Sequence, residues 1–336
     1  MKLSRRNFLK FSSLSFAATL LPPTPPDEAP RPVEGLGRVI KASYVYERPS
    51  VKARRVTLLL AETVFNIYAT VLSEDENYNR TWYQVQQGYV YSGLIQPVRW
   101  QLQSPVAKVP HEGFLGEITV PSTLAKNGPS ATAPSVYRLY YGTTHWIKAV
   151  EEDYKGRVWY RIFDDRLLYY SWVRSEHVRR ITADEVAPIS PLVENKRIEI
   201  ELEPQAFRCF EDDQLVLETL CSTGPYLRFE NGRQIYGTPS GEWIINRKRS
   251  SRHMAGDDFA SADFFDLPGV PWVSYFHWWG VSIHGTYWHN DYGKPHSHGC
   301  VNLPIETSKW VFRWAQPKSP VTDLETNGHG TKVVVF

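Results

Sequence analysis

A short stretch near the C-terminus concentrates residue types that can carry out covalent chemistry. Four of the ten histidines lie between His284 and His298, and Cys300 follows almost directly. A free cysteine has a pKa near ~8.5, so at neutral pH its thiol needs help to become a nucleophile. A histidine within hydrogen-bond reach supplies that help by taking the proton. The stretch therefore predicts Cys300 as a nucleophile, with His284 as its base.

Local patterns indicate how these side chains are positioned. Val281–His284 reads as a strand that ends at its histidine, and a turn follows. Ser297–Cys300 reads as a tight loop in which Gly299 frees the backbone. The adjacent N–H groups of Gly299 and Cys300 could converge on an oxyanion. One short region thus offers a nucleophile, a base and an anion-stabilising loop.

The surrounding sequence predicts a β framework with a single helix. Alternating or β-branched runs predict four strands, at residues 197–202, 215–220, 242–245 and 331–336. Ile305–Ala315 reads as a helix whose buried face holds Trp310, Val311 and Trp314.

The three cysteines cannot form a disulfide framework. If Asp212 and Asp213 turn a hairpin, position 216 lies opposite Cys209. Cys221 is then about 17 Å further along at ~3.4 Å per residue. A disulfide tolerates a Cα separation of only ~7 Å. We therefore expect Cys209 and Cys221 to be free thiols.

The middle of the chain consists of short β-branched and aromatic runs separated by turns. The expected strands are Val39–Tyr46, Val56–Leu60, Val64–Val71, Trp82–Val85 and Tyr89–Ser92. A faint repeat is present, because Thr81–Val85 recurs as Val158–Ile162 and Tyr89–Ser92 recurs loosely as Tyr170–Val173. Both copies resemble bacterial Src-homology-3-like (SH3-like) barrels, over roughly 37–100 and 113–182. One larger β-domain with core tryptophans remains an alternative.

Composition and the N-terminus restrict the class of protein. A net charge of +2 over 336 residues excludes a broad polybasic surface for nucleic acid. The apolar run Phe11–Leu21 is shorter than the ~20 residues that a membrane span needs. Ser4–Lys10, with its paired arginines, resembles a twin-arginine export signal. Pro22–Pro32 reads as an extended spacer, and the segment before it is either cleaved or kept as a membrane tether.

The motif Ser-His-Gly-Cys-Val-Asn at 297–302, with His284-Gly285 upstream, resembles the catalytic domain of L,D-transpeptidases, the YkuD domain. Supporting matches lie at 222–224, 238–241 and 330–333, so the resemblance spans roughly 195–336. It implies a β-sandwich enzyme that acts on peptidoglycan stem peptides without a cofactor or a metal. The cysteine attacks the carbonyl of the third stem residue, releases D-alanine and passes the acyl group to an amine.

The resemblance also implies roles for individual residues. Cys300 is the nucleophile, His284 the general base, and the Gly285 carbonyl orients the imidazole. His298 and Gly299 shape the loop, with Gly299 contributing an oxyanion N–H. Ser297, Asn302, Tyr275 and Trp288 are candidate substrate-binding residues. Weaker candidates are His289, His296, Ser222 and Thr223.

Three rival hypotheses stay open at this stage. The histidines and Cys300 are possible zinc ligands, although they lack a paired-ligand spacing such as Cys-x-x-Cys. A non-catalytic wall-binding protein would keep the fold without the chemistry. An L,D-carboxypeptidase would use the same nucleophile with water as the acceptor.

The sequence thus predicts a mainly β, exported protein of four parts. These are a signal and proline-rich linker at 1–33, SH3-like barrels at 34–112 and 113–190, and an L,D-transpeptidase domain at 191–336. The expected partners are peptidoglycan stem peptides and the twin-arginine export machinery, in the periplasm or the extracellular cell wall.

Overall fold

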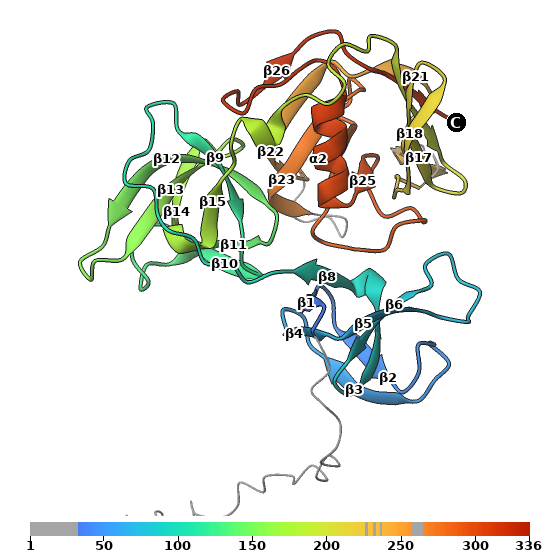
Figure 1. The fold of residues 1–336 in the computed structure, drawn as a ribbon, viewed down its shortest axis with the longest axis horizontal. Coiled ribbons are helices and arrows are strands. Elements are labelled where there is room, and N and C mark those ends of the chain that lie inside the picture. The colour runs from blue at the N-terminus through green and yellow to red at the C-terminus, as the bar shows by residue number, and fades with distance from the viewer. Residues whose placement is uncertain (1–32, 226–227, 231–232, 236, 257–264) are drawn as a thin grey trace, which may run out of the picture. The chain divides into compact units, whose positions relative to one another are not determined.

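The computed structural model describes residues 33–336, except 226–227, 231–232, 236 and 257–264. The predicted export signal and its linker lie outside the described residues, apart from Val33. The described chain is mainly β, as predicted, and its strands form several separate sheets (Figure 1). No helix within the described residues is long and apolar enough to cross a membrane.

The first group of strands, which we call the first β unit, covers residues 35–98 and contains two sheets. One sheet has the order β4-β1-β8, with β4 Val64–Ile67, β1 Gly35–Val39 and β8 Ile95–Val98. The other has the order β3-β2-β7-β6-β5, with β3 Arg55–Leu59, β2 Ser43–Tyr46, β7 Gly88–Tyr91, β6 Thr81–Val85 and β5 Ala69–Leu72.

Two strands that the sequence predicts as continuous are each divided in this unit. Val39–Tyr46 divides into the end of β1 and all of β2, and Val64–Val71 divides into β4 and β5. In both cases the two halves belong to different sheets. The chain therefore passes from one sheet to the other inside an unbroken run of strand-forming residues, so local composition does not reveal the break.

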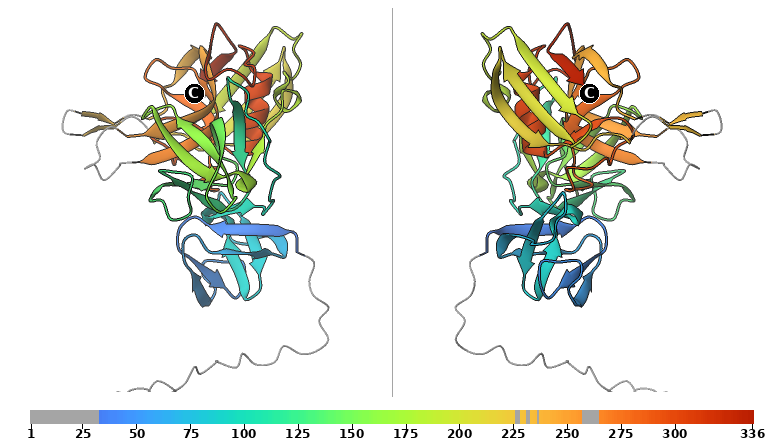
Figure 2. Two further views of the ribbon diagram at one scale, coloured as in Figure 1. Left: turned by 90° about the vertical axis from the view of Figure 1, so that its left-hand side faces the viewer. Right: turned by 90° about the vertical axis from the view of Figure 1, so that its right-hand side faces the viewer.

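The second β unit covers residues 114–180 and forms one sheet in the order β11-β10-β14-β13-β12-β9-β15. Its strands are β9 Phe114–Ile118, β10 Ser122–Lys126, β11 Ser135–Tyr140, β12 Thr144–Glu152, β13 Val158–Asp164, β14 Tyr169–Arg174 and β15 Val178–Arg180. Ile147, Tyr160 and Val173 lie in its buried core. Strand β12 packs against β22 and β23 of the C-terminal region. Figure 2 shows the green second β unit next to the orange and red C-terminal region.

The two β units share a hairpin, but its register differs from the sequence prediction. Tyr83 pairs with Val90 in the β6–β7 hairpin, and Tyr160 pairs with Val173 in the β13–β14 hairpin. Val90 therefore corresponds to Val173, two residues beyond the predicted match, because the second hairpin is longer on both sides of its turn. A 3₁₀ helix and a strand follow each hairpin, at Ser92–Leu94 with β8 and at Ser175–His177 with β15.

The tryptophans of the repeat belong to the interior of each unit. Trp82 and Trp159 are both almost fully buried. This burial favours a packing role over ligand binding for both residues. The assignment of either unit as an SH3-like barrel stays a prediction.

Among its described residues, the C-terminal region contains two five-stranded sheets and one α-helix. The first sheet has the order β18-β17-β16-β27-β21, with β18 Gln214–Leu220, β17 Ala206–Glu211, β16 Lys196–Glu201, β27 Lys332–Val335 and β21 Gly241–Ile244. The second has the order β25-β24-β23-β22-β26, with β25 Val301–Leu303, β24 Ser282–Gly285, β23 Asp266–Tyr275, β22 Arg247–Ala255 and β26 Thr326–Asn327. A separate hairpin joins β19 Arg228–Glu230 to β20 Arg233–Ile235.

The helix α2 spans Ile305–Trp314, close to the predicted Ile305–Ala315. Val311 and Trp314 are buried as predicted, whereas Trp310 is half-buried and Phe312 takes a buried position instead. Both sheets and α2 contribute side chains to one core cluster. The helix thus helps to hold together the two sheets that frame the predicted site.

Strand β22 has no clear signal in the sequence, because it reads Arg-Lys-Arg-Ser-Ser-Arg-His-Met-Ala. Its Lys248 is fully buried, which lowers the pKa of this lysine to about 7, and its Nζ donates to the carbonyl oxygens of Phe312, Ala315 and Pro317. The carbonyls at a helix C-terminus have no partner within the helix. Lys248 supplies a partner to the end of α2, which explains a lysine inside this strand.

All three cysteines are free thiols, in agreement with the prediction for Cys209 and Cys221. The β17–β18 hairpin turns at Asp212 and Asp213 as expected. Cys209 pairs with Leu217, one residue beyond the predicted position, because the register shifts between Cys209 and Phe210.

Candidate active site

Parallel pairing of β24 with β25 brings the predicted nucleophile beside the predicted base. His284 pairs with Asn302, and Cys300 lies two residues before Asn302. Side chains alternate between the faces of a strand, so Cys300 falls on the same face as Asn302 and His284. Ser282, two residues before His284, shares that face, and its Oγ lies 3.5 Å from the Cys300 sulfur.

Cys300 and His284 line one pocket of about 210 Å³. Much of its wall is apolar, from Met254, Phe265, Leu267 and Trp288. The polar part comes from His284, His296, Ser297, His298, Cys300 and Asn302. A largely apolar wall excludes water and strengthens electrostatic interactions inside the pocket.

The surroundings of His284 keep its imidazole uncharged and fix the position of its proton. Its Nδ1 lies 3.1 Å from the carbonyl oxygen of Gly285, the contact that the sequence resemblance implies. Burial lowers the pKa of His284 to about 4, so the imidazole is uncharged at neutral pH. With the proton on Nδ1 bound to the carbonyl, Nε2 carries the free lone pair that a general base needs.

Cys300 is half-buried, and burial raises the pKa of its thiol. The Ser282 side chain and backbone N–H act in the opposite direction by bonding to the sulfur. The resting site therefore holds a thiol and a neutral imidazole. Any attack by the sulfur would require loss of the thiol proton, which the neutral imidazole of His284 could accept.

The loop before Cys300 is held by the Ser297 hydroxyl. Gly299 has a φ of 123°, a region that favours glycine. Its N–H donates to Ser297 Oγ at 3.1 Å, and the same hydroxyl donates to the Cys300 carbonyl oxygen. The Gly299 N–H thus has a partner within the loop, and its role toward an oxyanion stays a prediction. The Cys300 N–H has no hydrogen-bond partner among the described residues, and it is the better candidate donor.

His289 fixes the orientation of the Asn302 side chain. The Asp291 N–H donates to His289 Nδ1 at 3.2 Å, so a neutral His289 carries its proton on Nε2. Nε2 lies 2.9 Å from the Asn302 amide, whose other atom is buried and unpartnered. The amide orientation that places Oδ1 against Nε2–H satisfies both groups. In that orientation the NH₂ group of Asn302 occupies the buried position that has no hydrogen-bond partner.

Comparison with known proteins identifies the region that carries these residues. Residues 195–335 match the family model of the L,D-transpeptidase catalytic domain, YkuD. This region is a YkuD domain. The match begins one residue before β16, ends with β27 and includes both His284 and Cys300. No curated protein sequence matches the chain at a significant level.

Solved structures similar to this chain include three that are described as L,D-transpeptidases. The enzyme from Xylanimonas cellulosilytica is 21% identical, with 45% of this chain and 63% of that chain covered and a TM-score of 0.29. The one from Mycobacterium smegmatis is 14% identical, with 53% and 90% covered and a TM-score of 0.34. The catalytic domain from E. faecium is 26% identical, with 43% and 98% covered and a TM-score of 0.32. This chain thus spans less than two thirds of the Xylanimonas protein.

The YkuD domain gathers most of the predicted site residues but not all of them. Trp288 lines the pocket with its ring 5.6 Å from that of His284. His298 is exposed at the pocket and lies 4.9 Å from the ring of Phe265. Tyr275 is buried in β23 beneath the guanidinium of Arg247 and is not among the described residues that line the pocket.

Ser222 and Thr223 belong to the frame of the YkuD domain rather than to the pocket wall. Ser222 exchanges two backbone hydrogen bonds with Asn302, and its hydroxyl donates to the Asp291 carbonyl. Thr223 is fully buried and bonds to the side chain of Gln205. Both residues hold the β25 end of the site in place.

Three pocket residues are absent from the sequence prediction. Met254, Phe265 and Leu267 come from the ends of β22 and β23 and from the residue just before β23. Alternation in these strands is masked by charged residues in β22 and by prolines in β23, so no pattern marked them. Within the described part of the chain, no group of three or more His, Cys, Asp or Glu residues is arranged to hold a metal ion.

Proposed function

We propose that this chain is an exported L,D-transpeptidase that forms cross-links in peptidoglycan. One observation carries the proposal: within a YkuD domain, Cys300 and the neutral His284 line the same pocket. A thiol beside an uncharged imidazole is the arrangement that nucleophilic acyl transfer requires.

Acylation would begin when Cys300 attacks the L-centre carbonyl of the third residue of a tetrapeptide stem. The thiol proton passes to His284 Nε2 as the sulfur–carbon bond forms. The Cys300 N–H stabilises the negative oxygen of the tetrahedral intermediate. Collapse breaks the peptide bond, and the proton on His284 passes to the departing amine of D-alanine. A thioester on Cys300 remains.

Transfer would follow the same path in reverse. An amine of a neighbouring stem attacks the thioester carbonyl and gives a proton to His284. The new amide bond forms as the Cys300 sulfur leaves and regains its proton. Water as the acceptor would instead give the L,D-carboxypeptidase reaction. The apolar wall formed by Met254, Phe265 and Leu267 disfavours water in the pocket and supports the amine acceptor.

The remaining parts of the chain would export the enzyme to the cell envelope and hold it on the cell wall. The paired Arg5 and Arg6 would direct the folded protein to the twin-arginine machinery and so to the cell envelope. Replacing both by lysine should leave the protein in the cytoplasm, as fractionation can test. The two β units would hold the enzyme on the wall, although their buried tryptophans argue against those rings as the contacts.

Purified protein incubated with tetrapeptide stems and analysed by mass spectrometry tests the reaction. Dimers together with free D-alanine are expected. D-alanine without dimers would indicate the carboxypeptidase. If neither D-alanine nor dimers formed, both proposed activities would be contradicted.

Cys300→Ala should abolish product formation while the fold survives. His284→Ala should slow the reaction about 10²–10⁴-fold. A chelator should leave the rate unchanged, and loss of activity would point to a metal site.

A further inference from the structure

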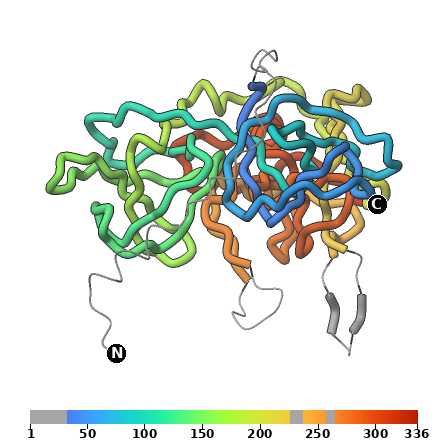
Figure 3. Tube along the Cα trace, turned by 90° about the horizontal axis from the view of Figure 1, so that it is seen from below, coloured from blue at the N-terminus to red at the C-terminus, as the bar shows by residue number. Residues whose placement is uncertain are grey.

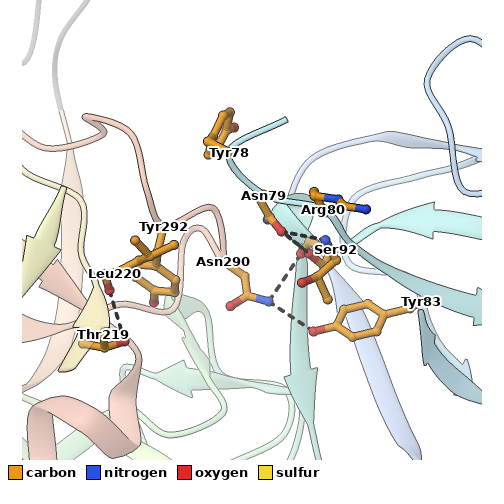
Figure 4. Close-up of a pocket in the computed structure, with 10 residues that line it drawn as sticks. Tyr78, Asn79, Arg80, Tyr83, Ser92, Thr219, Leu220, Asn290 and Tyr292 are labelled. Carbon is orange, nitrogen blue, oxygen red and sulfur yellow. Dashed lines mark hydrogen bonds between the residues drawn. The ribbon is translucent and has the colours of Figure 1, made fainter. Parts of the chain in front are cut away.

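Residues 285–299 connect His284 to Cys300, and we call them the connecting segment. The first β unit holds this segment at two points. Arg38 is almost fully buried, and its Nη2 donates to the Tyr287 carbonyl at 3.0 Å. Further along, the Asn290 N–H donates to the Gly93 carbonyl at 3.0 Å. The Asn290 side chain also reaches Tyr83 and the Ser92 carbonyl (Figure 4). Figure 3 shows the blue trace of this unit lying over the orange C-terminal region.

Asp291 is the centre of this contact. Its side chain is 3% exposed, and five side chains donate to its two oxygens. Three come from the first β unit, namely Tyr78 at 2.8 Å, Tyr91 at 2.6 Å and Asn79 at 3.4 Å. Two come from the connecting segment, Lys294 at 2.6 Å and His296 at 3.2 Å. A buried carboxylate with all these donors has one well-defined position.

The charge on Asp291 is firmly maintained. Burial alone would raise its pKa, but the hydrogen bonds from His296, Lys294 and the two tyrosines hold that pKa far below the ordinary range. The contact therefore persists as a charged one across the pH range in which an enzyme works.

Gly93 shows that this contact is specific to the first β unit. A Cβ atom at Gly93 would lie 2.6 Å from both Asp291 Oδ1 and the Tyr91 ring, so a larger residue does not fit. In the second β unit the hairpin register places Glu176 at the corresponding position. Arg174 likewise corresponds to Tyr91. The two copies differ at the positions where the first one meets the connecting segment.

A continuous set of contacts leads from Asp291 to the reacting residues. The Asp291 N–H sets the proton position on His289, and His289 orients Asn302. The Asp291 carbonyl accepts a hydrogen bond from the Ser222 hydroxyl, and the backbone of Ser222 pairs with that of Asn302. Asn302 is the register partner of His284 and lies two residues from Cys300.

We propose that the first β unit positions the active-site residues of the YkuD domain, and that Asp291 is the positioning residue through which it acts. The unit fixes the backbone of residues 287–291, and this backbone fixes His289, Asn302 and the loop that ends at Cys300. The proposal assumes that Cys300 and His284 react as a pair, but it does not depend on the identity of the substrate.

Three variants of the full-length protein test this role. Asp291→Asn removes the charge. Gly93→Ala forces the first β unit away from the connecting segment, because its Cβ would clash with Asp291. Tyr91→Phe removes a single donor with little risk to folding. Glu176→Ala, at the corresponding place in the second β unit, is the matched control. Two quantities are measured in each: the rate of Cys300 alkylation by iodoacetamide, and the proton position on His289 by ¹⁵N NMR.

We expect Asp291→Asn and Gly93→Ala to change the alkylation rate about tenfold or more, since a shift of ~1 Å in a reacting group has effects up to 10². In both, the His289 proton should no longer reside on Nε2 alone. Tyr91→Phe should show the same changes more weakly, and Glu176→Ala should match the wild type.

Unchanged alkylation and unchanged His289 signals in the folded variants would overturn the proposal. A loss of thermal stability without either change would reduce the contact to a purely structural one. Equal effects in Glu176→Ala would also refute it. Because neither measurement uses peptidoglycan, a wild type that fails to release D-alanine would contradict the proposed function and leave this test intact.

Discussion

At the level of single residues, burial leaves Cys300 and His284 as a neutral pair. Many cysteine nucleophiles rest as thiolates because a nearby positive charge lowers their pKa. Here burial acts on both groups, raising the pKa of the thiol and lowering that of the imidazole to about 4. A neutral thiol is a weaker nucleophile than a thiolate, so the resting group is less prone to unspecific reaction.

This neutral pair predicts an unusual dependence on pH. An ordinary histidine base, with a pKa near ~6.5, loses activity as pH falls through 6. His284 stays unprotonated down to about pH 4, so the rate of acylation by tetrapeptide should hardly fall between pH 7 and pH 5. A pH–rate profile of single-turnover acylation measures this, and a decline centred near pH 6.5 would contradict it. Alkylation of Cys300 by iodoacetamide should in contrast keep rising above pH 9.

At the level of elements, the strands with regular alternation are predictable and β22 is not. β16, β18, β24 and β27 lie within one or two residues of their predicted bounds, because alternating or β-branched composition marks a strand locally. β22 is stabilised instead by partners that come from distant parts of the chain. Its Lys248 finds hydrogen-bond acceptors only when the end of α2 lies beside it.

Replacing Lys248 should therefore destabilise the C-terminal region. Lys248→Met keeps much of the side-chain volume but leaves three carbonyls without their donor. Unsatisfied buried groups cost about 1–3 kcal/mol, so the free energy of unfolding should fall by at least that amount. Urea unfolding followed by tryptophan fluorescence measures the change. Lys318→Met, at an exposed lysine of the same region, is the control and should be nearly neutral.

At the level of the whole molecule, the second β unit is bound to the YkuD domain through charged residues. Asp165 pairs with Arg249 and Arg252 of β22. His253, also on β22, lies between Asp164 of the second unit at 2.6 Å and Asp266 of β23 at 2.5 Å.

This arrangement makes the free energy of unfolding depend on pH. Burial alone would lower the pKa of His253, but Asp164 and Asp266 raise it above 6.5. The stabilisation is therefore complete below pH 6.5 and is lost as pH rises through the folded-state pKa. Asp164 has a lowered pKa, although burial opposes this, so acid below about pH 4 also weakens the contact.

We expect the wild type to lose stability from pH 6.5 upward, and His253→Gln to lose this slope. Chemical denaturation at a series of pH values measures both. An identical slope in the two proteins would show that His253 is not responsible. His111→Gln, at a fully exposed histidine, is a suitable control.

The sequence alone determined the mainly β class of fold and identified the residues on which the proposed chemistry rests. The motif at 297–302 with His284 upstream indicates a thiol nucleophile and a base, because these residue types have few other uses at such spacing. Regular alternation indicates the mainly β fold, and the turn at Asp212 and Asp213 gives the hairpin that keeps Cys209 and Cys221 apart. These features depend on neighbouring residues, so they can be read locally.

Only the tertiary structure decided how the site is held. The parallel pairing of β24 with β25 places Cys300 beside Ser282, and the loop geometry directs the Gly299 N–H to Ser297 Oγ. The contacts of Asp291 with Tyr78 and Tyr91 join residues about two hundred positions apart. No local period encodes such contacts, because they arise from the packing of complete units against one another.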